Sequence, residues 1–164
     1  MTRVLIAGTY DPITLGHMDL IELAAREYGH VTVAIFVNPD KEGHHLLSPE
    51  RRRELICLAC AHLQNVDAVL GEGYTADYAR ENGYDLLLRG WRDEGDLAWE
   101  EEMARYNLAR GGIPTRLVKA DPRHAALSST EVRRLICAGE LDALSSCVPA
   151  ACIPRLRQWL AEEK

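Results

Sequence analysis

Short apolar runs alternate along the chain with longer stretches in which apolar residues recur at helical spacing. Several of the short runs are rich in β-branched residues, which is typical of buried strands. Because a helix between two strands returns the chain to the same end of the sheet, consecutive strands in such a pattern are parallel. The pattern predicts five parallel strands, at residues 4–7, 31–37, 66–70, 85–88 and 115–118.

The stretches between the strands predict helices on both faces of this sheet. Ser48 and Pro49 are suited to be an N-cap and a first helical residue, and Ser128 with Glu131 has the spacing of a capping box. Helices are expected at about residues 15–28, from 49, at 75–81, at 96–109, from 128 and from 149. We therefore expect an α/β fold, a single doubly wound, Rossmann-like domain over residues 1–164 with a helical tail from about 137 to 164.

Length and charge narrow the range of functions. The chain has 164 residues, which suits one domain with one core, and a formal net charge of −6. An acidic chain is a poor candidate for binding nucleic acid, but a few local cations can still hold a small anion. No apolar run approaches the roughly 20 residues of a membrane helix or matches a signal peptide. We expect a cytoplasmic protein without a nucleic-acid or membrane partner.

The five cysteines do not predict a metal site or a disulfide framework. Cys57 and Cys60 form a C-x-x-C pattern, but it lies inside an apolar helical stretch and no second ligand pair follows at matching spacing. We expect both to be small buried thiols and no protein-bound metal. A redox or zinc protein built on this pair is the alternative.

The first strand leads directly into a glycine- and histidine-containing turn. Gly8 lets the backbone approach a ligand, and Gly16 and His17 fall in the first turn of the next helix. Free backbone N–H groups and the positive end of the helix dipole favour an anion there, and an imidazole can donate to a phosphate oxygen. A corner with a capping histidine would show the same pair. The full string is Gly8-Thr9-Tyr10-Asp11-Pro12-Ile13-Thr14-Leu15-Gly16-His17.

Cationic and hydroxyl side chains follow other strands. Lys41 comes after the second strand, and Arg89 and Arg92 flank Gly90-Trp91 after the fourth. Arginine suits phosphate because its planar group binds two oxygens. Ligands of doubly wound sheets bind beyond the carboxyl ends of the strands, so these groups are expected to meet. A further cluster at the start of the helix from 128 consists of Ser128, Ser129 and Thr130.

The ten-residue string resembles the nucleotidyltransferase superfamily signature, G-x-F-x-P-x-[HT]-x-G-H. Its form with Asp11 and Thr14 is similar to the bacterial phosphopantetheine adenylyltransferase family. Thr14 stands where cytidylyltransferases and many nicotinamide-nucleotide adenylyltransferases carry a first histidine. The other clusters follow in the family's order and spacing, so the resemblance covers the chain from Val4 to about Arg134.

The resemblance implies an enzyme of coenzyme A biosynthesis. Its reaction is reversible transfer of the adenylyl group of ATP to 4′-phosphopantetheine, giving dephospho-coenzyme A and pyrophosphate, by in-line attack without a covalent intermediate. Mg²⁺ would accompany ATP, and the family's homohexamer would be the assembly. The alternatives are a related adenylyltransferase with another phosphorylated acceptor, such as nicotinamide mononucleotide, and a nucleotide-binding module without turnover.

The resemblance also implies a role for individual residues. Glu100 falls at a family glutamate, although Glu101 and Glu102 beside it are also typical of a solvated helix face. Trp91 replaces an aliphatic residue, and neither the loop after Lys41 nor the segment before Ser128 follows the family pattern. The implied catalytic residues are His17, Thr9, Lys41 and Arg89; the ATP-binding residues are Thr9, Tyr10, His17, Gly90, Trp91, Arg92, Glu100, His124, Ser128, Ser129 and Thr130; and the acceptor-binding residues are Thr9, Lys41, Thr75 and Arg89.

Overall fold

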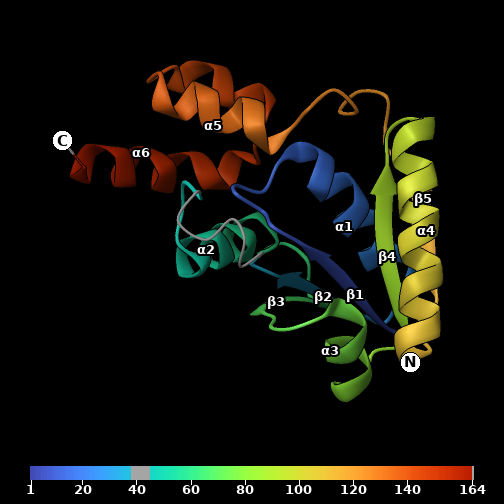
Figure 1. The fold of residues 1–164 in the computed structure, drawn as a ribbon. Coiled ribbons are helices and arrows are strands. Elements are labelled where there is room, and N and C mark those ends of the chain that lie inside the picture. Colours follow the sequence, from blue (N-terminus) through green and yellow to red (C-terminus); the bar gives the residue numbers. More distant parts are fainter. Residues whose placement is uncertain (38–44, 164) are drawn as a thin grey trace.

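A five-stranded parallel sheet forms the centre of the molecule (Figure 1). The structure, a computed structural model, describes residues 1–37 and 45–163. The strand order is β3-β2-β1-β4-β5. Strands β2 and β3 are added on one side of β1, and strands β4 and β5 are added on its other side. The strands are β1 (Arg3–Gly8), β2 (His30–Ile35), β3 (Val66–Leu70), β4 (Leu86–Trp91) and β5 (Thr115–Lys119). The predicted α/β fold is confirmed, and its switch point lies beyond the ends of β1 and β4.

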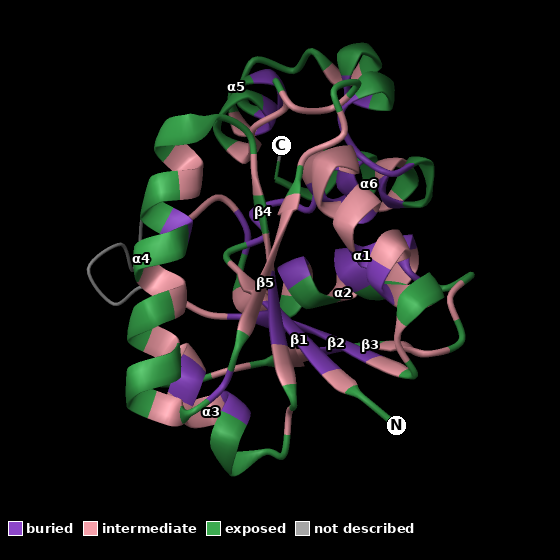
Figure 2. Ribbon diagram, turned by 90° about the vertical axis from the view of Figure 1, so that its right-hand side faces the viewer, coloured by how far each residue is buried: buried purple, intermediate pink, exposed green. Residues whose placement is uncertain are grey.

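Helices cover both faces of the sheet, with a larger core on one of them. The larger cluster joins Ile21, Leu55, Val132 and Leu156, which come from α1, α2, α5 and α6. The smaller cluster packs α3 against the opposite face, and α4 lies beside α3 (Figures 1 and 2). The helices are α1 (Leu15–Glu27), α2 (Pro49–Ala59), α3 (Thr75–Glu81), α4 (Glu94–Gly111), α5 (Ser129–Cys137) and α6 (Ile153–Glu162), with 3-10 helices η2 (Leu141–Ser146) and η3 (Ala150–Cys152).

The helix caps follow the sequence only in part. Ser48 accepts a hydrogen bond from the N–H of the third helical residue, as predicted. Ser128 likewise caps α5, but the Glu131 carboxylate pairs with Arg134 and leaves the expected capping box half formed. The complete capping box of the molecule's described part lies at the start of α1, where Thr14 is the N-cap.

Several expectations are wrong in detail. The strand expected over 31–37 ends at Ile35, and the last helix, expected from 149, begins at Ile153 after the short η3. The strand predicted over 85–88 continues to Trp91, because its pairing with β5 extends from Leu87 to Trp91. The C-x-x-C pair is not buried as a unit: Cys60 is buried against the core, whereas Cys57 is exposed. Both lie on α2, and a separation of three residues moves a side chain part of the way around a helix.

The residues after α5 are part of the main core. Leu144, Val148, Cys152 and Trp159 are buried in the larger cluster, so the tail seals the side of the sheet that carries α1 and α2. Within the described residues, no helix combines the length and the apolar character needed to cross a membrane.

Candidate active site

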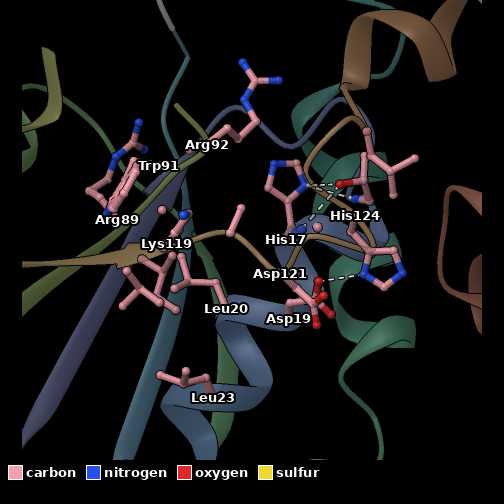
Figure 3. A pocket seen from close by; sticks show the side chains of 18 of the residues that line it. His17, Asp19, Leu20, Leu23, Arg89, Trp91, Arg92, Lys119, Asp121 and His124 are labelled. Carbon is pink, nitrogen blue, oxygen red and sulfur yellow. Dashed lines mark hydrogen bonds and ion pairs between the residues drawn. The ribbon is translucent and has the colours of Figure 1, made fainter. Parts of the chain in front are cut away.

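A cavity of about 920 Å³ opens at the carboxyl ends of β1, β4 and β5 (Figure 3). One wall is the exposed side of α1, from Gly16 to Arg26, and the opposite wall is the chain from Val118 to Ser129. The floor is formed by the ends of β1 and β4. Ten of the site residues predicted from the sequence line this cavity: Tyr10, His17, Arg89, Gly90, Trp91, Arg92, Glu100, His124, Ser128 and Ser129.

The turn between β1 and α1 is held in an unusual backbone conformation. Tyr10 has φ 51°, a left-handed value that costs a non-glycine residue of the order of 1–2 kcal/mol. Its hydroxyl donates to the carbonyl oxygen of Ile6 at 3.1 Å. Its ring lies edge-on to that of His17, with 4.8 Å between the two ring centres. A Cβ on Gly8 would lie 3.0 Å from the Tyr10 ring. The Tyr10 ring therefore packs against the His17 ring, and the Tyr10 hydroxyl already donates its hydrogen bond within the protein.

The hydrogen bonds of His17 determine which ring nitrogen carries the proton. The Thr14 N–H donates to His17 Nδ1 at 2.9 Å, and the His17 N–H donates to Thr14 Oγ1 at 3.4 Å. Nδ1 is thus an acceptor, so the proton of the neutral ring is on Nε2. Burial, together with the positive charge of Arg89, lowers the pKa of His17 to about 4. At neutral pH His17 is an uncharged donor at Nε2.

Two buried charged side chains attach this turn to the segment that follows β2. Arg52 is 1% exposed and donates to the carbonyl oxygens of Thr9 at 2.9 Å and Leu47 at 3.1 Å. Asp11, also 1% exposed, accepts from the N–H groups of Leu46 and Leu47 at 2.8 and 2.9 Å. Sequence reasoning missed both positions as site residues. A charged residue within the helix from Pro49 gives no signal that it is buried.

The beginning of α5 holds the turn from the other side. Ser129 Oγ donates to the carbonyl oxygen of Pro12 at 3.0 Å, and Arg133 Nη1 donates to that of Asp11 at 2.9 Å. Arg133 Nη2 also donates to Thr130 Oγ1 at 3.0 Å. The amino-terminal amides of α5 are therefore placed next to the first turn of α1, and two helix N-termini face the same cavity.

Arg89 is fixed by a bidentate ion pair with Glu100. Arg89 Nε and Nη2 donate to the two carboxylate oxygens at 3.0 and 2.8 Å, and Nη1 donates to the carbonyl oxygen of Ala7 at 2.7 Å. The Arg89 side chain is 42% exposed, whereas that of Glu100 is 9% exposed. Glu100 thus does not belong to a solvated helix face: it is the buried residue of α4, and Glu101 and Glu102 are exposed.

The end of β4 adds further positive charge. Arg92 Nε donates to Asp96 at 3.1 Å and its side chain is half exposed. Trp91 pairs in register with Lys119 on β5, and the Lys119 ammonium group lies 5.5 Å from the centre of the Trp91 ring. On the opposite wall, His124 Nδ1 lies 2.6 Å from Asp19 Oδ2. The labelled side chains in Figure 3 show these groups around the opening.

The carboxylates that line the cavity all have cationic or imidazole partners. Asp19 and Glu22 pair with histidines, and Asp96, Glu100 and Asp121 pair with arginines. In the part of the chain that the structure describes, no group of three or more His, Cys, Asp or Glu side chains could hold a metal ion.

Some predicted site residues are not brought to the cavity. Thr9 and Thr130 are exposed beside it, and Thr75 begins α3 without lining it. Lys41 lies outside the described residues.

The sequence and the fold are similar to those of known proteins. Residues 5–135 match the family model described as cytidylyltransferase-like. A phosphopantetheine adenylyltransferase from Synechococcus sp. (strain JA-2-3B'a(2-13)) is 39% identical over 156 residues, which cover 94% of this chain and 95% of that protein. The crystal structure of a lipopolysaccharide core biosynthesis protein from Thermoplasma volcanium GSS1 is similar with a TM-score of 0.53 at 20% identity, covering 74% of this chain and 97% of that one. The latter similarity concerns the fold alone.

The environment of His17 can be measured directly. Long-range ¹H–¹⁵N NMR spectra should show the Nε2–H tautomer and a titration midpoint of about 4. Because this pKa lies below the value of about 6.5 for an exposed histidine, the unfolded state binds the proton more tightly. The stability contributed by a neutral His17 is present above pH 6.5 and decreases as the pH falls toward 4. A midpoint near 6.5, or an Nδ1–H tautomer, would contradict the geometry.

Proposed function

This chain belongs to the cytidylyltransferase-like family of nucleotidyltransferases, and from that membership we propose that it transfers the adenylyl group of ATP to 4′-phosphopantetheine. The products are dephospho-coenzyme A and pyrophosphate. The observation that carries the proposal is the pairing of a neutral donor, His17, with a fixed guanidinium, Arg89, at one cavity. The name of the 39% identical relative supports the choice of acceptor.

The chemistry requires little beyond positioning and charge stabilisation. The phosphate of the acceptor is already a nucleophile, so it attacks the α-phosphorus of ATP in line without a covalent intermediate. Arg89 holds the attacking phosphate, and His17 donates from Nε2 to the charge that develops on the α-phosphate. Thr9 and Lys41 assist at the acceptor. Because the ring of His17 is neutral, it stabilises charge by a hydrogen bond and not as a cation.

The triphosphate fits the far side of the cavity. The amides at the start of α5, with the Ser128 hydroxyl, form an anion site, and Arg92 adds a positive charge. When bound, Mg²⁺ would neutralise phosphate charge. The carboxylates that line the cavity are already paired with other side chains. The cavity therefore suits an Mg²⁺ ion whose ligands are mainly phosphate and water oxygens, and not one enclosed by protein ligands.

We further propose that the enzyme works in the cytoplasm, where ATP is available, as a homo-oligomer. Large apolar side chains are exposed on the outer helices: Trp99 is 59% exposed, Leu108 54%, Tyr106 43% and Tyr74, next to α3, 60%. Exposed apolar groups of this size favour burial against another surface.

Pyrophosphate release tests the reaction. We expect release from Mg·ATP with 4′-phosphopantetheine and not with nicotinamide mononucleotide. His17→Ala should lower turnover by on the order of 10²–10³, because it removes one donor to the transition state. Release only with nicotinamide mononucleotide would replace the proposed acceptor. If neither acceptor gave pyrophosphate while ATP still bound, the chain would be a binding module and the proposal would fail.

Glu100→Gln tests whether this glutamate acts through Arg89. The variant keeps the size of the side chain but removes the charge that fixes the guanidinium, so the KM for 4′-phosphopantetheine should rise about tenfold. The KM for ATP should change less than twofold. Glu101→Gln, one residue further on α4 and exposed, is the matched control. A rise confined to the KM for ATP would show instead that Glu100 contacts the nucleotide.

Sedimentation velocity tests the assembly. We expect the wild-type protein to sediment as a species several times larger than the 18.3 kDa chain. Trp99→Asp should shift the distribution toward the monomer, because it places a charge on an exposed apolar position. A wild-type protein that sediments as a monomer at all concentrations would refute the proposed oligomer.

A further inference from the structure

The wall of the cavity formed by residues 120–127 is a connection without regular secondary structure between β5 and α5. Its start is joined to the sheet where the Ala120 N–H donates to the carbonyl oxygen of Trp91 at 2.8 Å. Its end is joined to α5 through the cap at Ser128. Between these points the wall contributes Asp121, His124 and other residues to the lining of the cavity (Figure 3).

Most hydrogen bonds within this wall are local. The His124 N–H donates to the carbonyl oxygen of Asp121 at 2.9 Å, and the Leu127 N–H donates to that of His124 at 3.0 Å. Arg123 donates to the carboxylate of Asp121, which precedes it by two residues. Such turns shape the segment, but they do not determine its distance from the rest of the molecule.

Leu127, at the end of the wall, packs against the larger core cluster, and one side-chain hydrogen bond or ion pair joins the wall to another element among the described residues. His124 Nδ1 lies 2.6 Å from Asp19 Oδ2, and the two side chains are 22% and 26% exposed. Asp19 is on α1, two residues beyond His17, and lines the cavity. The contact therefore spans from the helix that carries His17 to the wall that leads into Ser128 and Ser129.

We propose that Asp19 and His124 are a positioning pair that sets the width of the nucleotide half of the cavity. The pair is short and partly shielded, so it can order a segment that has no other side-chain hydrogen bond or ion pair to a neighbouring element in the described part of the chain. Without it, the wall has more conformations to lose when ATP binds. The groups that hold the acceptor, such as Arg89, lie on β4 and do not depend on this contact. The inference rests on the proposed function, because it takes ATP as the ligand.

A double-mutant cycle on ATP affinity tests the pair. Titration calorimetry with Mg·ATP, without acceptor, would compare wild type, Asp19→Asn, His124→Gln and the double variant. Each single change should weaken binding about tenfold, and the double variant should bind no more weakly than either, since both remove one interaction. Asp19→Glu should recover part of the affinity, and the KM for 4′-phosphopantetheine should change less than twofold.

Asp142→Asn is the matched control, since it removes an exposed ion pair with Arg157 outside the cavity. Melting temperatures of all variants would show that they fold. If Asp19→Asn bound ATP as wild type does while His124→Gln did not, His124 would contact the nucleotide directly and the positioning role would be refuted. Effects that multiply to about 100-fold in the double variant would refute it too. Wild-type protein that failed to bind ATP would instead refute the proposed function.

Discussion

The hydrogen bonds that fix the backbone between β1 and α1 are the constraint on which the site depends. Arg52 holds this turn from α2, and Ser129 with Arg133 holds it from α5, in each case through carbonyl oxygens. The turn contains a left-handed Tyr10, whose strain persists only because these bonds over-determine the conformation. His17 then emerges at one position and with one tautomer.

Placing a neutral histidine beside an arginine suits the proposed chemistry. Burial and the charge of Arg89 both disfavour the imidazolium, while the bond from Thr14 assigns Nδ1 as the acceptor. The positive charge stays on Arg89, where its bidentate partner Glu100 holds it in one orientation. In the proposed mechanism the site thus separates two functions: the guanidinium attracts and orients an anion, and the imidazole donates a hydrogen bond whose direction is set before any ligand arrives.

Much of the fold and part of the site could be predicted from the residues. The five strands were predicted correctly in number and kind, because β-branched apolar runs and helical spacing are local signals. His17, Arg89, Arg92 and Ser128 could be expected at one edge, because parallel strands bring their carboxyl ends together. The extension of the fourth strand to Trp91 could not be predicted, since pairing with β5 depends on a partner distant in sequence.

The sequence by itself determined the alternation of elements, the glycine and histidine of the turn, and the order of the cationic clusters, since these follow from local spacing. Only the tertiary structure decided which charged side chains are buried and what they contact. Arg52 looks like a solvated helix residue in the sequence, and Glu100 is assigned to ATP by resemblance alone, yet Arg52 supports the turn and Glu100 fixes Arg89. Asp19 and His124 are 105 residues apart and meet across the cavity. The physical reason is that burial and ion pairing depend on which faces of distant elements pack together, and no local pattern encodes that choice.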